Sequence, residues 1–337
     1  MIQVRTTYSQ NIFIKNLHLI ILMLIVLLAF FLRYPAIARD SLWLDEAWRL
    51  QLFTAPLNFS DLKILISQVL GFDGLIRFIV YLFGANEWSL RAVSFYSGVL
   101  AVPSLYLLGY KISGKMLPPL IAAFLLAINP WHIAYSSEMA PYALGSFLFI
   151  LFLIVIIRFH EKNNNSLLIL SILIGAIFSV MHLYFFVLTL ICSFLFLVIN
   201  RHRASIKNKI TLLLLVILVL NIYQIMPFFA WAETDQVSLR YNINWTVGFP
   251  LKLLNAISSG PIPNRFVSTI SQMSIWYILF FSTLTVVTSL LFIRSFVFCI
   301  KLHKQIEILV VYSTFLYVLF IYLQGHLANS ACLRYLL

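Results

Sequence analysis

The sequence predicts an all-α polytopic membrane protein, with about nine transmembrane helices and additional interfacial helices in its first external loop. Of its 337 residues, 62% are hydrophobic and only 10% are charged, whereas a soluble domain carries roughly 25% charged residues. A globular core cannot absorb this much apolar surface. The apolar residues form long runs, and the basic residues cluster between these runs. Composition and spacing therefore indicate that most of the chain faces lipid.

Nine apolar segments account for this prediction. Residues 166–200 form one run of about 35 residues, roughly 52 Å as a helix, which is too long for one crossing. We divide it near Met181-His182, because His182 is its only strongly polar side chain. The first run, 17–32, followed by Ala36-Ile37-Ala38, also resembles a signal peptide, but it exceeds the usual apolar region of about 7–15 residues. The predicted spans are 17–32, 92–110, 117–134, 142–157, the two parts of 166–200, 210–231, 273–293 and 306–324.

The distribution of charge predicts the orientation in the membrane. With the N-terminus in the cytoplasm, the cytoplasmic segments carry thirteen of the 23 basic residues and two of the eleven acidic residues. The cytoplasmic side then has a net charge of +11 and the external side +1, as the positive-inside rule expects. We therefore expect a multi-pass protein of the plasma (inner) membrane. Nucleic-acid binding is not predicted, because the basic residues form no stripe between exposed aromatic residues.

The chain is predicted to be a single transmembrane module over 1–337, with external loops at about 36–90 and about 232–272. The first loop contains two apolar-periodic pieces, about 61–70 and about 75–83. These pieces are too short to span a bilayer of about 30 Å. They are typical of amphipathic helices that lie in the interface.

Two adjacent carboxylates, Asp45 and Glu46, follow the first span in the stretch Trp43-Leu44-Asp45-Glu46-Ala47-Trp48. Adjacent residues on a helix point about 100° apart. We therefore expect one acid to face a cavity and the other to contact an arginine. The candidate partners are Arg33, Arg39 and Arg49. From spacing alone, Asp45 also fits a helix N-cap with Glu46 in the first turn.

A second polar stretch, residues 129–142, lies between two predicted spans. Glu138 in this stretch would lie at the membrane surface, in the same compartment as Asp45. An alternative is that Glu138 is an acid at a helix start, ahead of Pro141. Tyr142 would be either an interfacial aromatic residue or a residue that stacks on a sugar.

In these stretches and their order, the chain resembles the GT-C glycosyltransferases, specifically the protein O-mannosyltransferase-like and aminoarabinose-transferase-like branch (glycosyltransferase family 39 type). That branch carries an Asp-Glu pair after its first span, here Asp45-Glu46. It then has a Gly-x-x-Glu-x-x-x-Arg stretch, here residues 84–91, and a Pro-x-x-x-x-Tyr-Ser-x-Glu-x-Arg-x-Tyr stretch, here residues 130–142. A His in a later turn matches His182, and an Arg-Tyr pair matches Arg334-Tyr335. The resemblance follows most of the chain in order.

Three features depart from this pattern. The Arg expected in the third stretch is Ala140. The His/Asp-Pro-Pro expected before the second interfacial helix is replaced by Gly71-Phe72-Asp73-Gly74, in which Asp73 retains an acid. The chain stops at Leu337, where members of the branch continue with more spans, so we expect a short variant or a C-terminally truncated sequence.

The resemblance implies a membrane glycosyltransferase that uses a polyprenyl-phosphate sugar donor on the external (periplasmic or lumenal) face. Asp45 would be the general base that activates an acceptor hydroxyl for inverting attack, and Glu46 would support it. The acceptor, whether lipid, glycan or protein, is not predicted. The implied substrate-binding residues are Asp73, Glu138, Tyr142, His182, Arg240 and Arg334, with Arg334 first and Arg240 second for the donor phosphate. Three of the carboxylates would also suit a divalent metal ion: Asp45, Glu46 and Asp73.

Two other functions share parts of this pattern. A transporter of polysaccharide or lipid-linked oligosaccharide would place ionisable groups within its spans, whereas the acids here lie outside them. An O-antigen-type polymerase would use a large late loop, such as 232–272. The early Asp-Glu pair favours the transferase.

Arg91 is expected to snorkel to the interface or to pair with Glu87.

Overall fold

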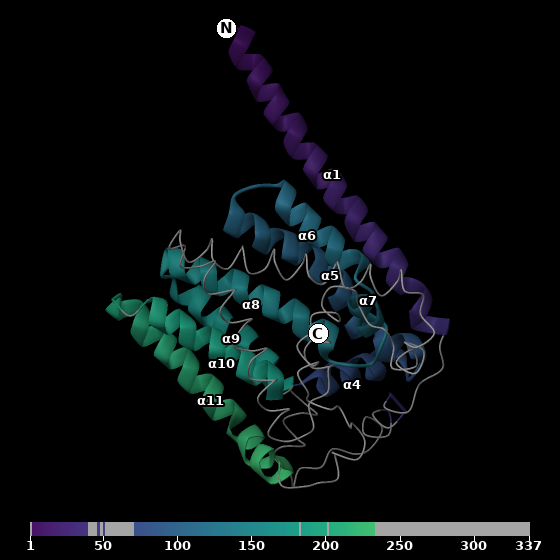
Figure 1. Ribbon diagram of the computed structural model, residues 1–337. Helices are drawn as coiled ribbons and strands as arrows, with labels where there is room; N and C mark the ends of the chain where they lie inside the picture. Colours follow the sequence, from purple (N-terminus) through teal and green to yellow (C-terminus); the bar gives the residue numbers. More distant parts are fainter. Residues whose placement is uncertain are drawn as a thin grey trace, which may run out of the picture. The chain divides into compact units, whose positions relative to one another are not determined.

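A computed structural model describes residues 2–39, 46–47, 50, 71–181, 183–200 and 202–232, and every regular element in these ranges is an α-helix (Figure 1). The chain divides into two compact units, Met1–His182 and Leu183–Leu337. The predicted all-α class is therefore confirmed. The first unit contains α1 (Ile2–Arg39), α4 (Phe72–Phe83), α5 (Glu87–Ser113), α6 (Leu117–Ile128), α7 (Pro130–Ser136), α8 (Tyr142–Lys162) and α9 (Asn165–Met181), and the second contains α10 (Leu183–Ile199) and α11 (Ala204–Ala232).

Several of these helices have the length and apolarity of membrane spans, and the chain is an integral membrane protein. In the described part, four helical segments are long and apolar enough to cross a bilayer: Leu17–Pro35, Glu87–Ser113, Tyr142–Lys162 and Ala204–Asn221. Three shorter apolar helices accompany them: Leu117–Ile128, Asn165–Met181 and Phe185–Ile199. The predicted spans at 273–293 and 306–324 lie outside the described residues.

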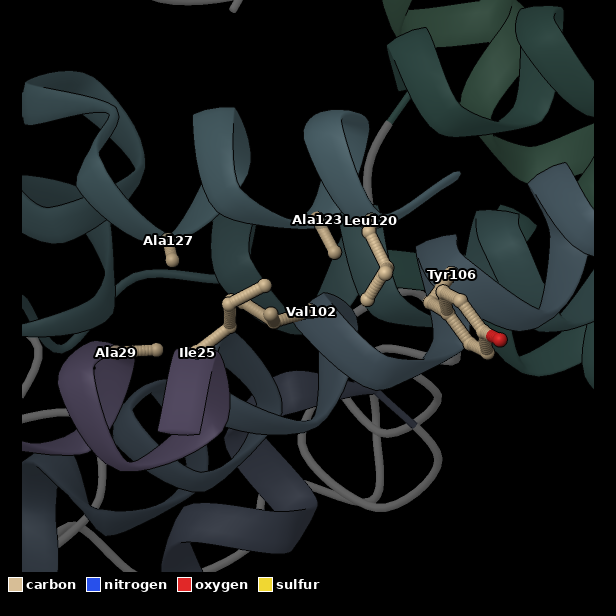
Figure 2. Packing of buried hydrophobic residues seen from close by; sticks show 7 residues of the cluster. All are labelled: Ile25, Ala29, Val102, Tyr106, Leu120, Ala123 and Ala127. Carbon is tan, nitrogen blue, oxygen red and sulfur yellow. The ribbon is translucent and has the colours of Figure 1, made fainter. Parts of the chain in front are cut away.

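In the first unit, α5 is the helix against which α1, α4, α6, α7 and α8 pack. One buried cluster joins α1, α5 and α6, as Figure 2 shows. Its members are Ile25, Ala29, Val102, Tyr106, Leu120, Ala123 and Ala127. The three alanines are 0% exposed, and small side chains at helix contacts let the backbones approach closely in a membrane. This packing brings the end of α1 to the beginning of α5, where the candidate site lies.

An ion pair shows that α5 and α8 run in the same direction. Lys111 Nζ, near the end of α5, lies 2.6 Å from Glu161 Oε2, near the end of α8. The two helices are therefore parallel, as the predicted topology requires for two spans separated by one return helix. The side chains of both residues are about one-third exposed, so the pair adds little stability. Its value is that it identifies one end of the bundle.

The predicted span 117–134 is wrong as a continuous helix. Helix α6 ends at Ile128, and α7 begins at Pro130 after the extended residue Asn129 (φ −63°, ψ 118°). Two local causes act together. The Asn129 side chain accepts a hydrogen bond from the His132 N–H at 2.9 Å and so caps α7. Pro130 has no N–H with which to continue the hydrogen bonding of α6. Hydropathy averaged over the segment does not reveal this break, because apolar residues lie on both sides of Asn129 and His132.

The predicted division of 166–200 falls at His182, which lies outside the described residues. Helix α9 ends at Met181 before it and α10 begins at Leu183 after it, so the division stays a prediction.

The second predicted interfacial helix is present as α4 and begins three residues earlier than expected, at Phe72. Its 12 residues extend roughly 18 Å, which is too short to cross a bilayer. It buries Phe72 and Ile76 and exposes Phe78 and Tyr81. This two-faced character is that of a helix lying along the interface. The other predicted interfacial helix, 61–70, lies outside the described residues.

Candidate active site

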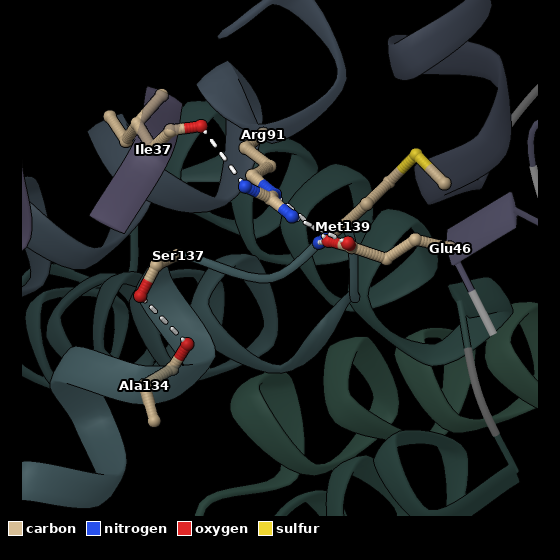
Figure 3. Close-up of polar contacts among 6 residues, drawn as sticks. All are labelled: Ile37, Glu46, Arg91, Ala134, Ser137 and Met139. Carbon is tan, nitrogen blue, oxygen red and sulfur yellow. Dashed lines mark hydrogen bonds and ion pairs between the residues drawn. The ribbon is translucent and has the colours of Figure 1, made fainter. Parts of the chain in front are cut away.

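The candidate site is centred on a buried ion pair between Glu46 and Arg91 (Figure 3). Arg91 Nε donates to Glu46 Oε1 at 3.0 Å, and Arg91 Nη2 donates to Glu46 Oε2 at 2.7 Å. The fork of the guanidinium thus matches both carboxylate oxygens, the strongest geometry available to such a pair. The exposed fractions are 1% for Glu46 and 2% for Arg91. The pair is therefore shielded from water.

Helix α5 presents Arg91 rigidly because its start is well defined. Asn86 accepts a hydrogen bond from the Ser89 N–H at 2.9 Å, and the Ser89 hydroxyl accepts one from the Asn86 N–H at 3.1 Å. This reciprocal capping box satisfies two main-chain donors at the helix start. Leu90 is buried in a cluster with residues of α4 and α8. Arg91 follows directly, so both the cap and the cluster fix its position.

Two main-chain groups complete the surroundings of the ion pair. The Met139 N–H donates to Glu46 Oε1 at 2.7 Å, and Arg91 Nη1 donates to the Ile37 carbonyl at 3.1 Å. Ile37 is within the last four residues of α1, where carbonyls lack a helical donor and the helix dipole attracts a cation. One turn beyond Arg91, the Ser94 hydroxyl donates to the Ala140 carbonyl at 2.9 Å. The site thus joins the end of α1, the start of α5 and the turn 137–141.

These contacts correct the expected partners. In the described part of the chain, Glu46 pairs with Arg91 and not with Arg33, and Arg91 pairs with Glu46 rather than with Glu87. The side chains of Arg39 and Arg49 lie outside the described residues. A buried pair costs desolvation energy, which is offset only where further hydrogen bonds satisfy both ions. The Ile37 carbonyl and the Met139 N–H supply such bonds.

The family to which the chain is similar is shown by a sequence match. The family model described as Dolichyl-phosphate-mannose-protein mannosyltransferase matches residues 67–231. Over these residues the chain is similar to that family. The predicted resemblance is therefore confirmed, and the match supports a membrane glycosyltransferase of GT-C type. No curated protein matches the chain.

The matched segment contains Arg91 and Met139 but begins after Glu46. It also contains three predicted substrate-binding residues with described positions. Asp73 lies partly buried in the first turn of α4, and Glu138 lies partly buried next to Met139. Tyr142 begins α8, and its ring lies 4.9 Å from that of Tyr135 at an angle of 59°. Glu138 therefore lies next in sequence to Met139, whose N–H bonds Glu46.

The other predicted site residues lie outside the described part: Asp45, His182, Arg240 and Arg334. Their roles stay predictions. Among the described residues, no group of three or more His, Cys, Asp or Glu side chains could hold a metal ion. Because Asp45 belongs to the predicted ligand set, the proposal of a divalent ion also stays a prediction.

A second buried guanidinium, that of Arg33, contacts His132 and not the predicted acid partner Glu46. Its exposed fraction is 0%, and its Nη2 lies 2.8 Å from His132 Nδ1. Desolvation, and second the charge of Arg33, lower the pKa of His132 to about 3. The imidazole is therefore neutral near pH 7, so Nδ1 accepts from Arg33 and Nε2 carries the proton toward Ser146 Oγ, 3.3 Å away. The available signal in the sequence was an arginine at the end of an apolar span.

Proposed function

We propose that the protein transfers a sugar, with mannose as the first candidate, from a polyprenyl-phosphate donor to an acceptor hydroxyl on the external face of the membrane. The family description supports both the lipid phosphate and mannose. The external face is supported by the charge distribution, which places Asp45, Glu46, Asp73 and Glu138 on that side.

The observation that carries this proposal is the anchoring of Glu46. Both of its carboxylate oxygens accept hydrogen bonds from Arg91, and one also accepts from the Met139 N–H. Both oxygens of Glu46 are thus engaged by the protein, and the carboxylate holds the chain in place. The neighbouring carboxylate, Asp45, is therefore our candidate for the base. Glu46 would fix the backbone from which Asp45 extends, so that Asp45 is positioned before substrate binds.

The proposed reaction is a single displacement. The Asp45 carboxylate takes the proton of the acceptor hydroxyl as its oxygen bonds to the anomeric carbon. The bond between that carbon and the phosphate oxygen breaks, and polyprenyl phosphate leaves with the bonding electron pair. Attack opposite the leaving group inverts the anomeric configuration. Negative charge that develops on the phosphate requires cations, for which Arg334, and second Arg240, are the candidates.

The remaining residues would bind the sugar and acceptor. Asp73 and Glu138 would accept hydrogen bonds from sugar hydroxyls, and Tyr142 would stack on a sugar ring. His182, which follows α9 in the sequence, would contact substrate. Of the predicted metal ligands, Asp45 and Asp73 would bind a divalent ion that supplies a further positive charge at the phosphate, whereas Glu46 is already bonded to Arg91.

The test uses the full-length protein in lipid vesicles with dolichyl phosphate mannose that carries radioactive mannose. The acceptors are those of the native membrane fraction. We expect wild type to transfer label, and Asp45→Asn to lower the rate by at least about 100-fold, since it removes the base. Transfer at the wild-type rate by Asp45→Asn would overturn the mechanism.

A matched control is Glu161→Gln, which removes a carboxylate at the other end of the bundle. We expect this variant to transfer at the wild-type rate. If wild type instead moves the donor across the vesicle membrane without transfer, the protein is a transporter. If it extends an existing glycan on the lipid, it is a polymerase. Either result would overturn the proposed function.

A further inference from the structure

The break between α6 and α7 leaves main-chain carbonyls that need donors. In an uninterrupted helix the Leu126 carbonyl would accept from residue 130, but Pro130 has no N–H, and the Asn129 N–H donates to this carbonyl only at the long distance of 3.4 Å. Arg33 Nη2 donates to this carbonyl at 3.2 Å, and Arg33 Nη1 donates to the Ala127 carbonyl at 2.9 Å. The cation thus lies at the negative end of the α6 dipole. In this respect Arg33 does for α6 what Arg91 does for α1.

Arg33 is fully engaged by the protein. A guanidinium has five N–H groups, and five acceptors surround this one at 2.8 to 3.2 Å. In the described part of the chain none of them is a carboxylate. They are Ser136 Oγ, the carbonyls of Ala29, Leu126 and Ala127, and His132 Nδ1. A guanidinium with all its donors in use is not available to a substrate phosphate, so its role is to hold the protein chain.

The contacts of Arg33 reach both ends of α7. His132 lies in the first turn of that helix and Ser136 at its last residue. The Ser136 hydroxyl in turn donates to the His132 carbonyl. Glycine at position 98 leaves room for this arrangement, because a β-carbon there would lie 2.6 Å from Ser136 Cβ and 3.5 Å from Arg33 Nε. The orientation of α7 is therefore set by Arg33 from one side and by Gly98 from another.

Met139, which contributes its N–H to the candidate site, lies three residues after the end of α7. The turn 137–141 carries the Met139 N–H, which donates to Glu46 Oε1 at 2.7 Å. A shift of α7 displaces this donor relative to Glu46. An error of about 1 Å in such a position can lower a rate by about 100-fold.

We propose that Arg33 is a positioning residue for sugar transfer, which acts through α7 and the Met139 N–H on Glu46. This inference rests on the proposed function, because Glu46 matters for turnover only if Asp45 is the base. Arg33 itself contacts no substrate. Its loss should lower kcat while leaving the KM for the donor unchanged.

The test compares Arg33→Lys, Glu46→Asp and the double variant, in the full chain and with dolichyl phosphate mannose as donor. Rates are expressed per amount of folded protein, measured by size-exclusion chromatography. We expect Arg33→Lys to lower kcat about 10-fold or more with donor KM within about 2-fold. Residues that act through one path are not additive. The double variant should therefore be within about 2-fold of the slower single variant.

Two further variants keep the test decisive. Ser136→Ala removes one acceptor from Arg33 and serves if Arg33→Lys does not fold, with the same expected coupling to Glu46→Asp. Lys111→Met, at the other end of α5, should leave kcat unchanged and should combine additively. Effects of Arg33→Lys and Glu46→Asp that multiply, or a raised donor KM at unchanged kcat, would overturn the inference.

Hydrogen–deuterium exchange separates failure of this inference from failure of the proposed function. We expect the amide of Met139 to exchange faster in Arg33→Lys and in Ser136→Ala than in wild type, and unchanged in Lys111→Met. A wild-type chain that transfers no sugar would overturn the proposed function, and the exchange result would then decide the link from Arg33 to Met139. Unchanged exchange at Met139 in both variants would overturn that link.

Discussion

Gly98 of α5 lies against Ser136 of α7, and the space between them is too small for one additional carbon. A β-carbon at position 98 would lie 2.6 Å from Ser136 Cβ and closer still to Ser136 Oγ. Such a contact forces the two helices apart. Because Ser136 also bonds Arg33, separation of the helices would disturb the network that holds α7.

We therefore predict that Gly98→Ala destabilises the protein by about 1–3 kcal/mol or more, the usual range for overpacking. Thermal unfolding in detergent would measure this. Gly109→Ala, on the same helix, is the matched comparison. Its added carbon would lie 3.0 Å from Pro119 Cβ, a contact that a small shift relieves. Equal melting temperatures for the two variants would contradict the packing argument.

The Glu46–Arg91 pair should behave as a buried pair rather than a surface one. We predict that Arg91→Met alone costs about 3–5 kcal/mol, because it leaves Glu46 buried without its partner. The double variant Arg91→Met and Glu46→Met should recover much of that stability, since no buried charge is left. Sugar transfer should be lost in both. A double variant no more stable than Arg91→Met would show that the pair stabilises the protein beyond the cost of an unpaired charge.

The depressed pKa of His132 predicts a stability that depends on pH. The pKa is about 3 in the folded protein and about 6.5 in an unfolded chain. Between these values the unfolded chain binds a proton that the folded protein does not, so stability falls as pH falls from about 6.5 toward 3. Above pH 6.5 this residue contributes no slope. Melting temperatures of wild type and His132→Gln, measured from pH 7.5 to 5, should converge toward low pH. Parallel curves would count against the neutral imidazole.

The orientation of the bundle can be tested with introduced cysteines. Asn86→Cys lies at the start of α5 and Glu161→Cys at the end of α8, so the parallel direction of these helices places them on opposite sides of the membrane. The charge distribution predicts that residue 86 is external and residue 161 cytoplasmic. A membrane-impermeant thiol reagent should label Asn86→Cys in intact cells and Glu161→Cys only after permeabilisation, with the native cysteines replaced. The reverse pattern would overturn the predicted orientation.

Much of the fold could be predicted from the sequence, because hydropathy and length are local properties. Helix α4, for example, followed from a pattern in which apolar residues recur on one face of a helix. The break at Asn129-Pro130 was missed, although both residues were visible. A proline at the first position of a helix looks the same in sequence as one inside an apolar span. The difference lies in whether a donor such as Arg33 is available for the exposed carbonyls.

The stretches of sequence that form the site could be predicted, but the ion pair between Glu46 and Arg91 could not. The acid pair and the motif that ends at Arg91 were both apparent, and the family match covers the motif but begins after the acid pair. Which arginine meets Glu46 depends on packing, because these residues are 45 positions apart. Of the three arginines predicted for the acid pair, Arg33 does not pair with Glu46, and the side chains of Arg39 and Arg49 lie outside the described residues. Arg91 pairs with Glu46 and not with the nearer Glu87. The contribution of Met139 was beyond reach, because its side chain has no part in the hydrogen bond.

That hydrogen bond has a consequence for how variation at the site is read. A main-chain N–H is supplied by every amino acid except proline, so the residue at position 139 can be substituted without loss of the hydrogen bond to Glu46. The buried side chain of Met139, 1% exposed, limits size there, but for reasons of packing. A comparison that scores chemical identity would therefore assign this position no part in catalysis. The only amino acid excluded at position 139 by the hydrogen bond is proline, which has no N–H. Met139→Pro should therefore be as harmful to sugar transfer as the loss of an acid.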